Sequence, residues 1–109
     1  MDRNLTVLKK MLDEIEFLNF DTKGVTFAAF MADERLKRSV SMTLINIGEL
    51  IRHLTKEFRK SHSDIPFDDI IGLRDVAAHG YKILRFEFIW ETLKRDVPEL
   101  QMKIEKLLP

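Results

Sequence analysis

Apolar residues recur at steps of three and four along residues 2–19, the spacing that places side chains on one stripe of an α-helix. This stripe predicts a first helix and consists of Leu5, Leu8, Leu12, Ile15 and Leu18. The following stretch NFDTKGVT interrupts the pattern, and Thr26 is placed to cap a short turn. A longer stripe then predicts a helix over about residues 33–60; its members are Leu36, Val40, Leu44, Ile47, Ile51, Leu54 and Phe58.

Two further helices are predicted in the second half of the chain. Apolar positions from Ile65 to Ala77 mark a helix that should end near Gly80, because glycine is a favoured helix-ending residue. Apolar residues from Phe86 to Leu107 keep their phase across Pro98, which predicts a continued helix with a kink at the proline. No segment alternates with a period of two. The pattern predicts an all-α bundle of four main helices, and the length fits a single domain over residues 1–109.

Composition narrows the possible functions only a little. The 18 basic and 18 acidic residues cancel, so a nucleic-acid site would have to be a local patch. The absence of cysteine excludes disulfides and thiolate zinc sites. No run approaches the roughly 20 apolar residues that a membrane span needs, so we expect a soluble, cytoplasmic protein. We also expect that it needs no cofactor.

The stretch RDVAAHGY, residues 74–81, combines side chains that packing alone does not require. On an ideal helix Arg74 and Tyr81 share a face, about 20° apart, whereas His79 lies about 140° from Arg74. Asp75 precedes His79 by four residues, a spacing that lets a carboxylate orient an imidazole. One interpretation is structural, with surface charges, a histidine favoured by the helix dipole and a tyrosine anchor. The other is a functional site.

This stretch resembles the R-x4-H-x-Y motif of HepT-type toxins in the HEPN ribonuclease superfamily. The similarity extends over roughly residues 4–108 and includes the stretches TKGVTFAAF, INIGEL, IPFDDIIGLR and WETLKRDVPEL. Phe67 stands where relatives often carry tryptophan, a change that should preserve packing. The resemblance implies a HEPN-type helical fold, a homodimer and a metal-independent endoribonuclease, with Arg74 and His79 as catalytic residues and Asp75 in a supporting position.

Elementary chemistry agrees with these implied roles. RNA is cleaved by its own 2′-hydroxyl if a base removes the hydroxyl proton, an acid protonates the leaving oxygen and a cation stabilises the phosphorane. Histidine titrates near pH 6.5 and can act as base or acid, and the donors of arginine fit a phosphate. The resemblance also implies a type VII toxin–antitoxin system, in which a minimal nucleotidyltransferase antitoxin attaches AMP to Tyr81. Packing or stacking on the substrate is the alternative role for Tyr81.

Other candidate residues favour simpler interpretations. His53 and His62 are too far apart for a compact metal site, and Asp64, Asp68 and Asp69 are more typical of a solvated helix start. A stripe of cations could meet an RNA backbone, although a solvated charged face is the favoured interpretation; it consists of Arg52, Lys56 and Lys60. The alternative to a ribonuclease is a noncatalytic helical module that binds nucleotides or proteins.

Overall fold

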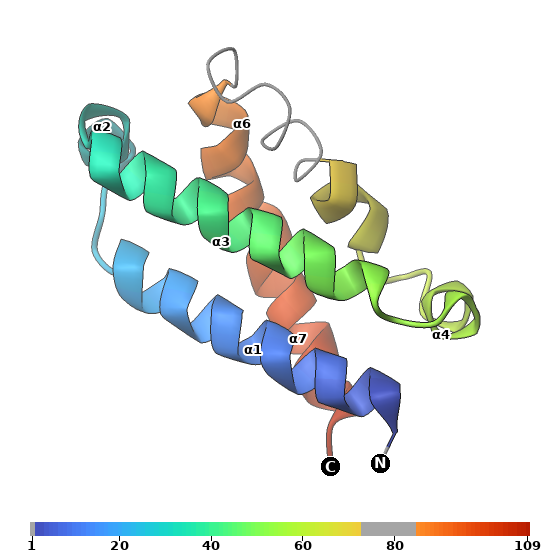
Figure 1. Cartoon of the computed structure of the whole chain (residues 1–109). Helices are drawn as coiled ribbons and strands as arrows, with labels where there is room; N and C mark the ends of the chain where they lie inside the picture. Colours follow the sequence, from blue (N-terminus) through green and yellow to red (C-terminus); the bar gives the residue numbers. More distant parts are fainter. Residues whose placement is uncertain (1, 73–84) are drawn as a thin grey trace.

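The computed structural model describes residues 2–72 and 85–109 (Figure 1). Two long helices, α1 (Arg3–Thr22) and α3 (Glu34–Arg52), are joined by the short helix α2 (Phe27–Ala32). A further short helix, α4 (Lys56–Ser61), precedes helical residues 67–72. The chain ends with α6 (Phe86–Glu91), the π-helical segment η2 (Thr92–Asp96) and α7 (Val97–Leu107). No strand occurs within the described ranges, and the all-α prediction is confirmed.

Side chains at the helix starts explain where several of these elements begin. The Thr26 hydroxyl accepts a hydrogen bond from the Ala29 amide at 3.1 Å, which confirms the predicted cap of α2. At the start of α3, the Asp33 carboxylate accepts a hydrogen bond from the Leu36 amide at 3.0 Å. Each cap satisfies an amide that would otherwise lack a partner in the first turn.

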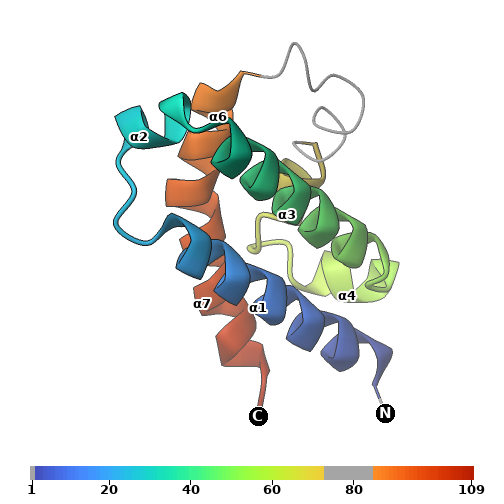
Figure 2. The same ribbon diagram turned by 60° about the vertical axis from the view of Figure 1, so that its left-hand side comes forward.

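The core is formed where α1 and α3 lie side by side and the last helices cross behind them (Figures 1 and 2). On α1 the fully buried side chains are those of Leu8, Met11, Ile15 and Leu18, while Leu5 and Leu12 are only partly buried. Corresponding stripes come from the other two long elements: Val40, Leu44, Ile47 and Ile51 on α3, and Val97, Leu100 and Ile104 on α7. Most members of the stripes predicted for these three helices are therefore core residues, together with Met11, which the predicted stripe on α1 did not include.

The predicted continuous helix over residues 33–60 is wrong, because α3 ends at Arg52 and α4 begins anew at Lys56. The Thr55 hydroxyl caps α4 by accepting from the Phe58 amide at 3.2 Å. Asn4 of α1 holds this cap in place: its Oδ1 accepts from the Thr55 amide at 3.0 Å, and its Nδ2 donates to the Thr55 hydroxyl at 3.2 Å. A tertiary contact thus interrupts a helix that the apolar stripe alone would continue.

The last helix continues past Pro98, as predicted, but its irregularity precedes the proline. Residues Thr92–Asp96 are π-helical, and the Val97 amide donates to the Thr92 carbonyl five residues earlier. An uninterrupted α-helix would bring the Pro98 ring against the carbonyl of Lys94 and would leave that carbonyl without its donor. The change of hydrogen-bond pattern in the turn before Pro98 allows the helix to continue, and α7 carries the proline in its first turn.

Candidate functional site

The predicted catalytic and modification residues Arg74, Asp75, His79 and Tyr81 lie outside the described residues, within 73–84. The helix end predicted near Gly80 falls there too. The structure does describe the segments on both sides of this stretch. These flanks are therefore the observable part of the candidate site.

The segment that precedes the motif is anchored in the core. Ile65, Phe67 and Ile70 are buried, with Ile70 fully inaccessible. Lys103 of α7 fastens the loop before them, since its ammonium group donates to the Asp64 carbonyl and to the Glu99 carboxylate, the latter at 2.9 Å. The hydrogen bond with Glu99 is the main cause that raises the pKa of Lys103 above its ordinary value. The segment that precedes Arg74 is thus held by apolar packing and by the ammonium group of Lys103.

The segment that follows the motif is held by aromatic packing. Ile89 is fully buried, and the Trp90 ring lies 5.1 Å from Phe30 and 5.8 Å from Phe27, measured between ring centroids. Phe86 meets Phe30 edge-on at 6.4 Å. Such tilted and edge-on contacts are favoured pair geometries for aromatic rings. Trp90 lies within the apolar pattern from Phe86 to Leu107 that predicted the last helix, and its contacts agree with that prediction.

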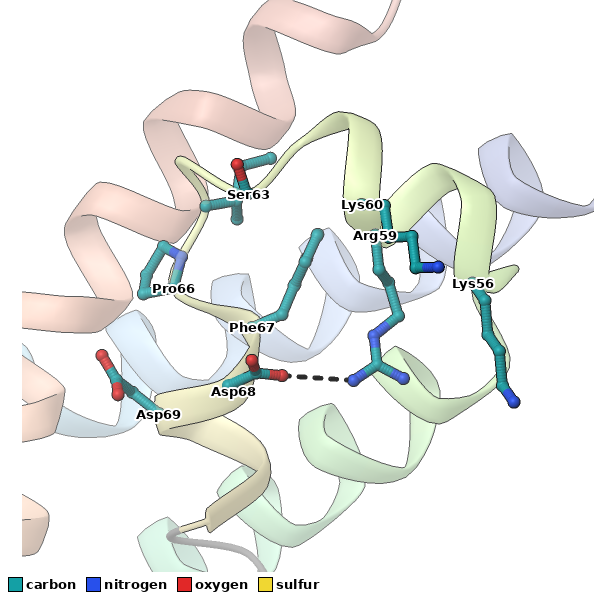
Figure 3. Close-up of a pocket in the computed structure, with 9 residues that line it drawn as sticks. Lys56, Arg59, Lys60, Ser63, Pro66, Phe67, Asp68 and Asp69 are labelled. Atoms are coloured by element: carbon teal, nitrogen blue, oxygen red, sulfur yellow. Dashed lines mark hydrogen bonds and ion pairs between the residues drawn. The ribbon is translucent and has the colours of Figure 1, made fainter.

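A surface pocket of about 590 Å³ lies beside the preceding flank. Figure 3 shows cationic side chains of α4 on one side of it and the carboxylates of Asp68 and Asp69 on the other. The pocket is lined by Lys56, Arg59, Lys60, Ser63, Ile65, Pro66, Phe67, Asp68 and Asp69. One ion pair spans it, between the Arg59 Nη2 and the Asp68 Oδ1 at 3.3 Å. The walls therefore have opposite charge.

The predicted cationic stripe is altered by the break between α3 and α4. Arg52 belongs to the last turn of α3, whereas Lys56 and Lys60 belong to α4 and line the pocket, where Arg59 joins them. The prediction of this stripe left out Arg59, because it took residues 33–60 as one helix and followed steps of four residues from Arg52. Arg59 differs from the two lysines in that its guanidinium group donates a hydrogen bond to Asp68, and this bond depends on the contact of α4 with residues 67–72.

The remaining predicted candidates have ordinary structural surroundings. The Nδ1 of His62 lies 2.9 Å from the Phe58 carbonyl oxygen, and its ring stacks on Phe58 with centroids 4.2 Å apart. His53 lines a groove between α1 and α3, together with the half-buried Glu49. Across residues 2–72 and 85–109, no group of histidines and carboxylates has a geometry that could hold a metal ion. Within the same ranges, no helix is long and apolar enough to cross a membrane.

Comparison with known proteins relates the whole chain to one family. The family model described as "Ribonuclease HepT-like" matches residues 1–107. A protein of Caldanaerobacter subterraneus subsp. tengcongensis named "Putative RNase TTE0752" is 39% identical over 101 residues, which are 93% of this chain and 90% of the relative. A Thermococcus cleftensis protein named "Probable ribonuclease HepT" is 30% identical over 100 residues, 92% of this chain and 91% of the relative. No solved structure matches the chain significantly.

Proposed function

Because the chain belongs to the HepT-like ribonuclease family, we propose that it is the toxin of a type VII toxin–antitoxin pair and cleaves RNA through Arg74 and His79. The observation that carries this proposal is the family match over residues 1–107, which includes the stretch RDVAAHGY. The anchoring of both flanks supports it, since a catalytic segment needs rigid support at its ends. Asp75 has the role of orienting His79.

The proposed reaction uses the 2′-hydroxyl of the substrate as nucleophile. A base removes the hydroxyl proton, the 2′-oxygen bonds to the adjacent phosphorus, and the 5′-oxygen leaves with a proton from an acid, so that a 2′,3′-cyclic phosphate remains. His79 performs proton transfer, and the guanidinium of Arg74 stabilises the negative charge that develops on the phosphorane. The mechanism requires no metal ion.

A symmetric homodimer would complete this site. One histidine cannot easily serve as base and acid in a single step, whereas two copies of the motif would supply two histidines and two arginines. Sedimentation at micromolar concentration should therefore give the mass of a dimer, and a monomer that cleaves RNA would refute this arrangement.

Tyr81 is the proposed point of control. The phenol oxygen would attack the α-phosphorus of ATP in the antitoxin's active site, pyrophosphate would leave, and the phenolic proton would pass to a base. The product carries AMP beside Arg74, where its bulk and negative charge would obstruct RNA. Tyr81→Phe should prevent the modification and preserve RNA cleavage; mass spectrometry that finds AMP on a different residue would refute the assignment.

The experiment that tests the activity is incubation of the purified protein with RNA in the presence of EDTA. We expect cleavage that leaves a 2′,3′-cyclic phosphate, and its loss in Arg74→Ala and in His79→Ala. Circular dichroism should show that both variants retain the helical content of the wild type. Equal cleavage of a fully 2′-deoxy substrate, or full activity of His79→Ala, would contradict the mechanism.

A further inference from the structure

The pocket beside α4 has more positive charge than its own carboxylates balance. Arg59 is paired with Asp68, as the dashed line in Figure 3 shows. Asp69 points away from Arg59 in the same view. The pKa of Arg95 is raised mainly by its hydrogen bond with Asp96, and the negative charge of Asp69 is a smaller cause of the same rise. No ion pair involves Lys56 or Lys60 in the part of the chain that the structure describes. Two cations therefore remain for a ligand.

The helix that carries these lysines contributes one partly buried side chain, that of Phe58, to the edge of the core. None of the side chains of α4 is buried, and the helix is held through its first residues by the contact of Thr55 with Asn4. Residues four positions apart lie on the same face of a helix, with Cβ atoms roughly 6 Å apart, so Lys56 and Lys60 point their charges toward the same region of solvent. The arrangement is a fixed support with two ammonium groups that form no ion pair with any residue the structure describes.

The pocket is also close to the motif along the chain. Asp69, in its wall, precedes Arg74 by five residues, and five residues of polypeptide span at most about 18 Å in any conformation. If the scissile phosphate of an RNA strand lies at Arg74, phosphates a few nucleotides further along the strand can reach this pocket.

We propose that Lys56 and Lys60 bind backbone phosphates of the RNA strand whose cleavage is assigned to Arg74 and His79. This inference rests on the proposed ribonuclease function and adds a second contact surface to it. Lysine ammonium groups are strong phosphate binders, and each neutralised phosphate releases counterions. A protein partner fits this surface less well, because lysine is depleted in protein–protein interfaces relative to the rest of the surface.

The test measures binding of a single-stranded 2′-O-methyl RNA, which lacks the nucleophilic hydroxyl and stays intact. For single strands the slope of log Kobs against log salt is about −0.7 per phosphate contact. Lys56→Gln and Lys60→Gln should each reduce the magnitude of this slope by about 0.7, and the double variant by about 1.4. Glutamine has a helix propensity close to that of lysine, so α4 should persist.

Lys23→Gln is the matched control. Lys23 is exposed at the C-terminal end of α1, about 28 Å along that helix from Asn4, and should leave the slope unchanged. An unchanged slope in the double variant, or an equal loss in Lys23→Gln, would overturn the inference. Loss of binding to a protein partner with unchanged RNA binding would also overturn it and assign the surface to that partner.

The two proposals fail in different ways. Unaltered salt dependence with normal cleavage of natural RNA would remove the role of Lys56 and Lys60 and leave the ribonuclease intact. A reduced slope in a protein that cleaves no RNA would support the binding surface and refute the catalytic proposal.

Discussion

Replacement of Asn4 by alanine should destabilise the protein more than its partial exposure suggests. The Asn4 side chain makes two bonds to Thr55, 51 residues away, and one of them satisfies the Thr55 backbone amide. A buried or partly buried hydrogen bond contributes about 1 kcal/mol net, and an amide left without an acceptor costs more. We therefore expect Asn4→Ala to lower the free energy of unfolding by about 2 kcal/mol, equivalent to a fall in Tm of roughly 8 °C.

Asn19→Ala provides the matched control on the same helix. Asn19 donates to Gln101 at 3.0 Å in an exposed position, so its loss should cost about 0.5 kcal/mol or less. Both substitutions replace asparagine by alanine within α1, so the gain in helix propensity cancels between them. The comparison isolates the contact with Thr55.

Urea denaturation followed by circular dichroism would measure these values, with an unchanged m-value as the sign of two-state unfolding. Thr55→Ala should cost a similar amount, because it removes both the cap of α4 and the acceptor for the Asn4 Nδ2. Since the two variants share one bond, the double variant should be about 1 kcal/mol more stable than the sum of their effects implies. Additive effects, or an Asn4→Ala variant as stable as Asn19→Ala, would refute this account of the helix break.

Two further predictions concern buried polarity and pH. Ser41 is 2% exposed and its hydroxyl has no hydrogen-bond partner among the described residues, so Ser41→Ala should raise the free energy of unfolding by about 1 kcal/mol. Thr43→Val, which removes a hydroxyl that donates to the Ser39 carbonyl at 2.9 Å, should not stabilise; equal urea midpoints for both variants would contradict this reasoning. The pKa of Lys103 is raised above 10.5 in the folded protein, so its stabilising effect is complete below about pH 10 and is lost as pH rises through the folded-state pKa. In thermal melts, the Tm of the wild type should exceed that of Lys103→Gln by less and less as the pH rises above about 10. A Tm difference that grows above about pH 10 would refute the stabilising role of the Lys103 ammonium group.

Local patterns in the sequence predicted the parts of the fold that local forces determine. The stripe on α1 and the Thr26 cap depend on residues within a few positions of each other, and both are confirmed. The break after Arg52 was missed because Leu54 and Phe58 keep the helical phase, while Asn4, the residue that holds the Thr55 cap in place, is distant in sequence. No local pattern reports such a contact.

The same limit applies to the candidate site. The motif residues Arg74 and His79 were identified by their spacing and their resemblance to a family, and their geometry stays a prediction. The pocket beside α4 depends on how α4 meets residues 67–72, so Arg59 acquired a role only once Asp68 was placed opposite it. Sequence spacing indicated the charges; the fold determined which of them are paired.

The π-helical turn at Thr92–Asp96 links the length of the last helix to the presence of Pro98 in homologous sequences. A π turn closes its hydrogen bond over one residue more than an α turn, so deletion of one residue there would restore the α pattern and leave the apolar faces of α6 and α7 in phase. The shortened helix would then bring the Pro98 ring against a carbonyl in the preceding turn, at a cost of about 3 kcal/mol. Homologues that lack the extra residue should therefore also lack the proline, and the length of this helix and the presence of Pro98 should be gained or lost together.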